Sequence, residues 1–382
     1  NIKGNNKERG GDPMALLGWI SNDFIDKELF APFVVKKDLD YLSDLKRKYR
    51  LILKKAENSG ADETSLKILQ HDSKTICDAL KAYYNGHISL AHTKIKNLVK
   101  SCIDHPLAVN TINESTAFLG TPGTEIQFFR ARTNDNPNGY SAKEMLHLPL
   151  SLRVKTGNYR FSLPGIPSLY LGNSSYVCWL ETGMPTEHTF HVSPVLLDGT
   201  QKILNLAVMT RSLWYLNDLE ENTVHCWLKL LIMMIATSYT VEEEKRFFKS
   251  EYIISQSIML ACKELGLDGI AYFSKRVKDE IFGYAAINLA LFAVYDKNNT
   301  YSDICRHLKI DDSYSYMMFK QLKSPNTYRD YPLRSISTGM ITNIGNYKRQ
   351  YGYSSTKFCD FDKFLFTSWD DKDLIPWGNA LL

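Results

Sequence analysis

The spacing of apolar residues changes near residue 120, and this change constrains the fold more than any other feature of the sequence. From Lys37 to Cys102 apolar residues recur at steps of three and four, as they do on one face of a helix. Beyond the Gly- and Pro-rich stretch 119–124, short runs of β-branched, aromatic and leucine residues follow instead. We therefore expect an α+β protein, with an all-α N-terminal domain before a mixed β core with flanking helices.

Three helices are expected in the N-terminal part. The first carries basic residues from Lys46 to Lys55, which we expect to form a solvated face. The second should end at Asn85-Gly86, because this pair is typical of a helix stop, and the third should run from Ile88 to Cys102.

Strands and helices are both expected after the boundary. Strands are predicted at residues 125–132, 168–171, 194–197, 269–274 and 286–295. Helices are predicted after Asn173-Ser174, over Trp227–Ala236 as a buried helix, and over Tyr252–Leu265 before Gly266. We divide the chain into a tail (1–14), a helical domain (15–120), a mixed domain (121–300) and a C-terminal extension packing on it (301–382). Met14 is a candidate natural start.

Composition and charge exclude several classes of protein. Gly and Pro, at 21 and 13 residues, are too few for a collagen-like or low-complexity chain. A net charge of +4 is too mild to indicate a nucleic-acid partner. Seven cysteines without a CxxC pair fit a reducing cytoplasm. The longest apolar run, Leu230–Ala236, is too short to span a membrane, and residues 1–13 lack the apolar region of a signal peptide.

One stretch and two later segments carry candidate chemistry. An arginine precedes a Gly/Pro turn, a tyrosine follows in a strand, and a glutamate lies eleven residues further on a helix. These are Arg160, Gly165-Ile166-Pro167, Tyr170 and Glu181. Ser274 ends the stretch Leu267–Phe273, and Asn288 begins another apolar strand. Each residue alone is also typical of an ordinary surface or core position, so the ordered set carries the hypothesis.

The ordered set resembles the RES-domain family, named for its Arg, Glu and Ser. Phe128-Phe129-Arg130 resembles the family's opening strand, so the resemblance covers about 125–295. Two departures are that Ser274 is followed by Lys275-Arg276 and that Arg160 follows Asn158-Tyr159. The resemblance implies a fold similar to the ADP-ribosyltransferase toxins, NAD as the substrate, and cleavage of its nicotinamide-ribose bond. No other cofactor is expected.

The residue types suit that reaction. Because nicotinamide leaves as a neutral base, positive charge develops on the ribose, and a fixed carboxylate is its natural stabiliser. Glu181 would face the ribose, and Arg160 would hold the pyrophosphate through its forked donors. Tyr170 would stack on a ring or hold the ribose, while Ser274 would orient Glu181 or the nicotinamide amide.

Three further residues are expected at the nucleotide. Arg130 is a candidate second phosphate anchor. Asn173 begins a helix whose free N–H groups would attract phosphate oxygens. Gln256, in a segment that resembles a piece of longer family members, would contact the nucleotide or make polar contacts in the core.

Other motifs add less to the functional hypothesis. His188 and His191 lack a nearby ligand cluster, so no metal site is expected. No Walker or Rossmann glycine loop is present in the sequence. The helical domain resembles the HEPN modules that precede some RES domains, but residues 1–119 lack the Arg and His pair of active HEPN ribonucleases. We therefore expect it to be regulatory or to form a homo-oligomer.

Three functions remain open. The first is a toxin that consumes NAD by hydrolysis or phosphorolysis, with a cognate antitoxin or immunity protein as a possible partner. The second is a protein ADP-ribosyltransferase with the same pocket. The third is a non-catalytic RNA-binding defence sensor using the basic helix, which ranks last because aromatic residues are not interleaved with those basic residues.

Overall fold

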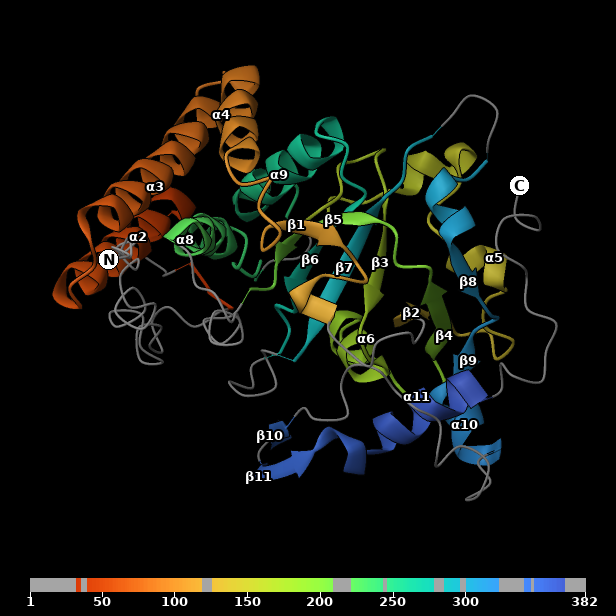
Figure 1. Cartoon of the computed structure of the whole chain (residues 1–382). Helices are drawn as coiled ribbons and strands as arrows, with labels where there is room; N and C mark the ends of the chain where they lie inside the picture. Colours follow the sequence, from red (N-terminus) through yellow and green to blue (C-terminus); the bar gives the residue numbers. More distant parts are fainter. Residues whose placement is uncertain are drawn as a thin grey trace, which may run out of the picture.

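The protein is an α+β molecule in which a helical N-terminal region packs against a mixed sheet (Figure 1). The computed structural model describes residues 32–35, 40–118, 126–208, 221–242, 246–277, 285–295, 300–322, 340–344 and 347–367. The expected tail 1–14, Met14, the boundary stretch 119–124 and most of 324–346 lie outside these residues.

The three helices predicted in the N-terminal part are confirmed. They are α2 (Tyr41–Asn58), α3 (Glu63–Tyr84) and α4 (Ile88–Lys100). Asp40 and Asp62 begin the first two, where each side chain accepts a hydrogen bond from a backbone N–H three residues on. Gly86 follows α3 with φ of 81°, the left-handed backbone that glycine adopts without strain.

The solvated basic face expected on α2 is wrong in part. Lys48 is buried, with its Nζ atom 4.2 Å from the centre of the Phe33 ring. Arg47 donates to the buried carboxylate of Asp44 at 3.1 Å. The long apolar stem of a basic side chain allows it to pack inside while its charge finds a ring or an acid.

In the described part of the chain the main sheet has nine strands, in the order β1-β5-β6-β7-β3-β2-β4-β8, with β9 also paired to β4. Among the described strands, β5 and β6 form the only parallel pair. The five predicted strands are confirmed as β2 (Ile126–Thr133), β3 (Ser168–Gly172), β4 (Phe190–Leu197), β6 (Gly269–Phe273) and β7 (Ile287–Phe292). Strands not predicted are β1 (Val109–Thr111), β5 (Lys202–Leu206), β8 (Leu308–Ile310), β9 (Tyr314–Ser315), and the separate hairpin β10 (Met340–Ile344) and β11 (Tyr347–Gly352).

The remaining helices flank the sheet. They are α5 (Ala142–Met145), α6 (Ser175–Glu181), α8 (Glu221–Ala236), α9 (Ile253–Glu264), α10 (Tyr316–Leu322) and α11 (Lys357–Thr367), with short 3-10 turns between them. The predicted helices at 173–181, 227–236 and 252–265 correspond to α6, α8 and α9. Gly266 follows α9 with φ of 76°, as expected for its stop.

Strand alternation divides the core into two faces. Ile270 and Ala290 face a cluster shared with α8 and α9, whereas Ala271 and Leu289 face a second cluster. Because successive side chains on a strand point to opposite faces, two buried faces require apolar residues at every position. The central strands β6 and β7 are accordingly buried throughout.

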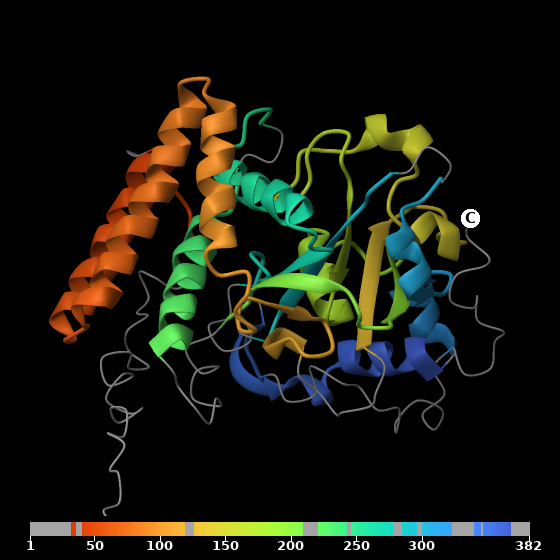
Figure 2. The ribbon, with the colours of Figure 1, turned by 45° about the horizontal axis from the view of Figure 1, so that its top comes forward.

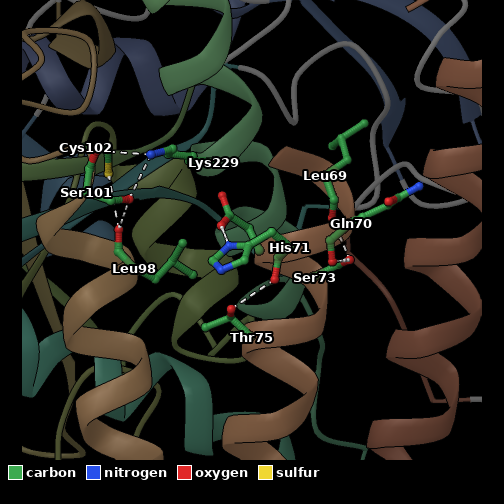
Figure 3. A network of polar contacts seen from close by, with 10 residues as sticks. Leu69, Gln70, His71, Ser73, Thr75, Leu98, Ser101, Cys102 and Lys229 are labelled. Carbon is green, nitrogen blue, oxygen red and sulfur yellow. Dashed lines mark hydrogen bonds and ion pairs between the residues drawn. The ribbon is translucent and has the colours of Figure 1, made fainter. Parts of the chain in front are cut away.

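The helical region and the sheet share one core. Leu69 and Ile95 of α3 and α4 belong to the same buried cluster as Trp227 of α8. Figure 3 shows Lys229 of α8 at the end of α4, where its Nζ donates to the Ser101 carbonyl at 3.2 Å and to the Ser101 hydroxyl at 3.0 Å. Since β1 also comes from residues before 120, the expected domain boundary does not coincide with the edge of the sheet.

The C-terminal extension packs on the sheet on a side away from the helical region (Figure 2). Strands β8 and β9 pair with β4, and α11 contacts α6 and β4. The aromatic finish of the sequence explains this packing, because Phe361 and Phe366 are fully buried against β2 and β4.

All seven cysteines are unpaired and buried. Over the described ranges, the helices are all too short or too polar to cross a membrane.

Candidate functional site

The central strands place three polar residues on one face of the sheet. Tyr170 of β3 pairs with Ala290 of β7, and Tyr272 of β6 pairs with Asn288 of β7. Positions 288 and 290 have the same parity on β7, so Tyr170, Tyr272 and Asn288 project to the same face. This is the face that α8 and α9 cover.

Glu181 lies at the end of α6, which begins directly after β3. The Ser174 hydroxyl accepts from the Val177 N–H at 3.1 Å and so starts the helix. The Glu181 Oε1 atom accepts from the Ser274 hydroxyl at 2.7 Å and from the Asn288 amide at 2.6 Å. Three separate elements therefore converge on one half-buried carboxylate.

Arg160 is held by backbone carbonyls and a tyrosine ring. Its Nη1 and Nη2 atoms donate to the carbonyls of Thr237 and Tyr239 at 2.5 and 2.6 Å, and its guanidinium lies 5.1 Å from the centre of the Tyr252 ring. Two of the five guanidinium donors are thus used to fix the group, which leaves three for other acceptors. The forked pair expected to hold a pyrophosphate is partly engaged by the protein itself.

The tyrosine hydroxyl at 170 organises the loop that carries Arg160. It accepts from the Phe161 N–H at 3.2 Å and lies 2.8 Å from the Ser162 hydroxyl. The Gln256 amide donates to the same loop, at 2.6 Å to Asn158 Oδ1 and 3.0 Å to the Tyr159 carbonyl. Of the two roles considered for Gln256, polar contacts within the protein are the one that these distances describe.

Lys275, next to Ser274, is 6% exposed. Within the described residues its side-chain nitrogen makes no hydrogen bond or ion pair, and it lies 5.9 Å from the centre of the Phe273 ring. Burial lowers the pKa of Lys275 well below its usual range, the charge of Arg160 lowers it further, and Glu181 opposes both effects. Lys275, Arg160 and Glu181 therefore share one electrostatic environment.

Two predicted binding residues are occupied by other contacts. The Arg130 guanidinium donates to the carbonyls of Met145 and Tyr170, at 3.2 and 2.9 Å. The Asn173 side chain bridges β3 to β7, donating to the Ala285 carbonyl at 2.8 Å and accepting from the Ile287 N–H at 3.1 Å. Both side chains thus support the strands that carry Tyr170 and Asn288.

Two N–H groups at the start of α6, which were expected to be free, are bonded within the protein. The Ser175 N–H donates to the Asp362 carboxylate of α11 at 3.0 Å, and the Val177 N–H donates to Ser174. A carboxylate of the protein itself occupies the position that was expected to attract phosphate.

The two histidines considered for a metal do not form a ligand set with other residues. His191 is fully buried in β4, and the part of the chain described here contains no group of three or more His, Cys, Asp and Glu side chains placed to hold an ion.

Sequence reasoning missed three residues of this region. Asn288 was noted as the start of a strand, but its bond to Glu181 depends on pairing between β7 and β3, the strand that leads into α6. Lys275 was noted only as a departure from the family pattern. Tyr252, which stacks near Arg160, belongs to a segment from which only Gln256 was selected.

The comparison with known families covers this whole site. Residues 129–308 match the model of the RES domain. The match includes Arg160, Tyr170, Glu181 and Ser274, whereas α2 to α4 and α11 lie outside it. The HEPN resemblance of the helical region stays a prediction.

The chain is also similar to a toxin-named relative and, in part, to a solved structure. YopC of Bacillus subtilis (strain 168), a candidate toxin by its name, is 28% identical over 254 residues, covering 63% of this chain. The chain spans 57% of the length of that relative. A chain from the crystal structure of the M. tuberculosis MbcT–MbcA toxin–antitoxin complex is 11% identical, with a TM-score of 0.30, covering 60% of this chain and 96% of the other.

Proposed function

We propose that this chain is an enzymatic toxin that breaks the nicotinamide-ribose bond of NAD, with water or phosphate as the acceptor. The RES-domain match and the similarity to a candidate toxin support the class. A cognate antitoxin or immunity protein is part of the same proposal.

The observation that carries the proposal is the environment of Glu181. Ser274 and Asn288 both donate to Oε1, whereas no described residue donates to Oε2. Two donors on one oxygen fix the orientation of the carboxylate and leave the second oxygen available to a ligand. A fixed carboxylate with one available oxygen suits a reaction that develops positive charge on a sugar.

The proposed reaction needs little proton transfer at the leaving group. The bond from C1′ of the ribose to nicotinamide breaks, and nicotinamide departs as a neutral base with the bonding electron pair. Glu181 stabilises the positive charge left on the ribose. Water or phosphate then forms the new bond at C1′ and loses a proton to solvent, which gives ADP-ribose or its 1-phosphate.

Two basic side chains that share the electrostatic environment of Glu181 suit the diphosphate of the substrate. Arg160 keeps three N–H groups beyond those bonded to Thr237 and Tyr239. The amine of Lys275 is buried without an acid partner in the described residues and burial lowers its pKa, so a bound anion would favour its protonated form.

A product assay tests the proposal. The purified full chain is incubated with NAD⁺, with and without phosphate, and nicotinamide release is followed together with the second product. Free ADP-ribose identifies water as acceptor, and the 1-phosphate identifies phosphate. No nicotinamide release under either condition would contradict the proposal, and label from NAD on a macromolecule would favour the transferase alternative.

The RNA-binding alternative gains no support from the basic helix. Lys48 is buried and Arg47 pairs with Asp44, so part of the basic run is used inside the protein.

A further inference from the structure

The carboxylate of Asp362 lies at the start of the helix that carries Glu181, although the two residues are far apart in the sequence. Its Oδ1 atom accepts from the Ser175 N–H at 3.0 Å, and its Oδ2 atom accepts from the Tyr353 hydroxyl at 2.6 Å. Asp362 is 1% exposed. It belongs to α11, beyond the residues that match the RES domain.

The contact between α6 and the C-terminal segment extends beyond this carboxylate. The Tyr176 and Trp179 rings of α6 lie 5.1 and 5.5 Å from the ring of Phe358. Val177 of α6 shares a buried cluster with Tyr353 and Cys359. The first turn of α6 is therefore held by both a buried carboxyl acceptor and aromatic packing.

The same buried cluster reaches the two donors of Glu181. It includes Val277, three residues after Ser274, and Ala286, two residues before Asn288. The Ser274 N–H also donates to the Ala286 carbonyl at 2.8 Å. The C-terminal segment thus packs behind the helix that carries the acid and behind the backbone that carries its donors.

The short length of α6 makes its start important for its end. Six residue steps at about 1.5 Å each place Glu181 about 9 Å along the axis from Ser175. A seven-residue helix is too short to be stable alone, so tertiary contacts at its first turn decide where its last residue lies.

We propose that Asp362 is a positioning residue for Glu181, and that the C-terminal segment 353–366 is needed for an active site whose other described residues lie in the RES-matched region. The test of this proposal by kcat rests on the proposed function, whereas its test by hydrogen exchange of α6 does not. Asp362 acts through the backbone of α6 and does not contact the reacting atoms.

The structural test is hydrogen exchange of the α6 amides in the full chain without substrate. Asp362→Ala removes both acceptor oxygens, and loss of a helix cap should speed exchange at Ser175–Val177 by at least about fivefold. Asp362→Asn keeps an acceptor oxygen of the same shape and should retain most of the protection. Exchange unchanged by Asp362→Ala would overturn the proposal.

The catalytic test compares kcat with KM. Asp362→Ala should lower kcat roughly tenfold to a hundredfold, because a displaced Glu181 loses transition-state contacts, while KM changes little. Asp362→Asn should restore most of kcat. Asp360→Asn, on the same helix but paired with Lys357 at the surface, serves as the matched control and should leave kcat unchanged.

A milder variant guards against misfolding. Tyr353→Phe keeps the buried ring and removes only the hydroxyl that donates to Asp362. It should lower kcat less than Asp362→Ala does. It should also speed exchange of the α6 amides by a smaller factor than Asp362→Ala does. Faster α6 exchange at undiminished kcat in Asp362→Ala would also overturn the proposal. If the wild-type chain releases no nicotinamide, the proposed function fails while the exchange result still decides this inference.

Discussion

An aspartate from each side of the RES-matched residues helps to hold one of the two charged groups, Arg160 and Glu181. In both cases the aspartate accepts a hydrogen bond from a tyrosine hydroxyl. On the N-terminal side, Asp44 of α2 accepts from the hydroxyl of Tyr239 at 2.9 Å, and the Tyr239 carbonyl holds Arg160. On the C-terminal side, Asp362 of α11 accepts from the hydroxyl of Tyr353 at 2.6 Å and caps the helix of Glu181. Both aspartates are buried.

The two pairs differ in how the negative charge is balanced. Asp44 also accepts from Arg47 at 3.1 Å, so a cation compensates its carboxylate. Asp362 has no ion-pair partner in the described ranges, and burial raises the pKa of its carboxyl to about 7 even though Ser175 and Tyr353 oppose this effect. The N-terminal contact is therefore balanced in charge, whereas the C-terminal contact depends on a proton near neutral pH.

The largest effect should come from removing Glu181, the acid on the helix that the C-terminal contact holds. Glu181→Gln should lower kcat for nicotinamide release by roughly 10²–10³-fold, because an amide cannot oppose positive charge on the ribose. The change should leave the free energy of unfolding nearly unaltered. The exposed Glu187, paired with Lys320, provides Glu187→Gln as a control. Undiminished turnover in Glu181→Gln would contradict the catalytic role proposed for the acid that the C-terminal contact holds.

The next effect should be a pH dependence of stability that comes from the C-terminal contact. Because the folded-state pKa of Asp362 lies above its ordinary value of 3.8, the folded chain holds this proton to higher pH than the unfolded chain. Between about pH 4 and 7 the contribution of Asp362 to stability should therefore fall as pH rises, in total by a few kcal/mol. Urea unfolding of wild type and Asp362→Asn across this range measures it. A difference between the two that does not vary with pH would contradict the charge argument.

A smaller effect should distinguish the two aspartates directly, because their Asn variants should change the free energy of unfolding differently at pH 7. Asp44→Asn should lower the free energy of unfolding by about 1–2 kcal/mol at pH 7, since Arg47 loses its counterion while Tyr239 keeps an acceptor. The value is modest because Arg47 is partly exposed. Asp362→Asn should leave stability at pH 7 unchanged or raise it. Equal destabilisation by both variants would show that the two contacts are equivalent.

The smallest effect should come from Lys275, the buried amine that shares the electrostatic environment of Glu181. Lys275→Met should raise KM for NAD about tenfold, equivalent to about 1.4 kcal/mol, because a diphosphate would lose one cation. Lys275→Arg should keep most of the affinity. Titration with ADP-ribose, followed by calorimetry, measures binding apart from turnover. Equal affinity of Lys275→Met and wild type for ADP-ribose would exclude an anion at this position.

The sequence predicts the parts of this molecule that depend on local pattern. Helix periods and stop signals identify α2, α3, α4 and α9, and alternating or continuous apolar runs identify the five longer or central strands. Strands β1, β8 and β9 have two or three residues and carry too few positions for a period to be recognised. Strand β5 was missed although it is as long as β3 and β6.

The site divides in the same way. The order of Arg160, Tyr170, Glu181 and Ser274 could be recognised along the chain, and the structure brings Ser274 to Glu181 at 2.7 Å. The carbonyls of Thr237 and Tyr239 that hold Arg160 could not be predicted, because a backbone acceptor leaves no mark in the sequence. Asp362 could not be predicted either, since its contact with Ser175 spans 187 residues.

The position of Asp362 late in the chain has a consequence for synthesis. A ribosome adding roughly 5–20 residues per second reaches Asp362 about 10–40 s after Glu181. During that interval the nascent chain carries the acid of its site on a helix that lacks its buried acceptor. Under the proposed function, a newly made chain would therefore release nicotinamide at its full rate only after α11 has docked against α6.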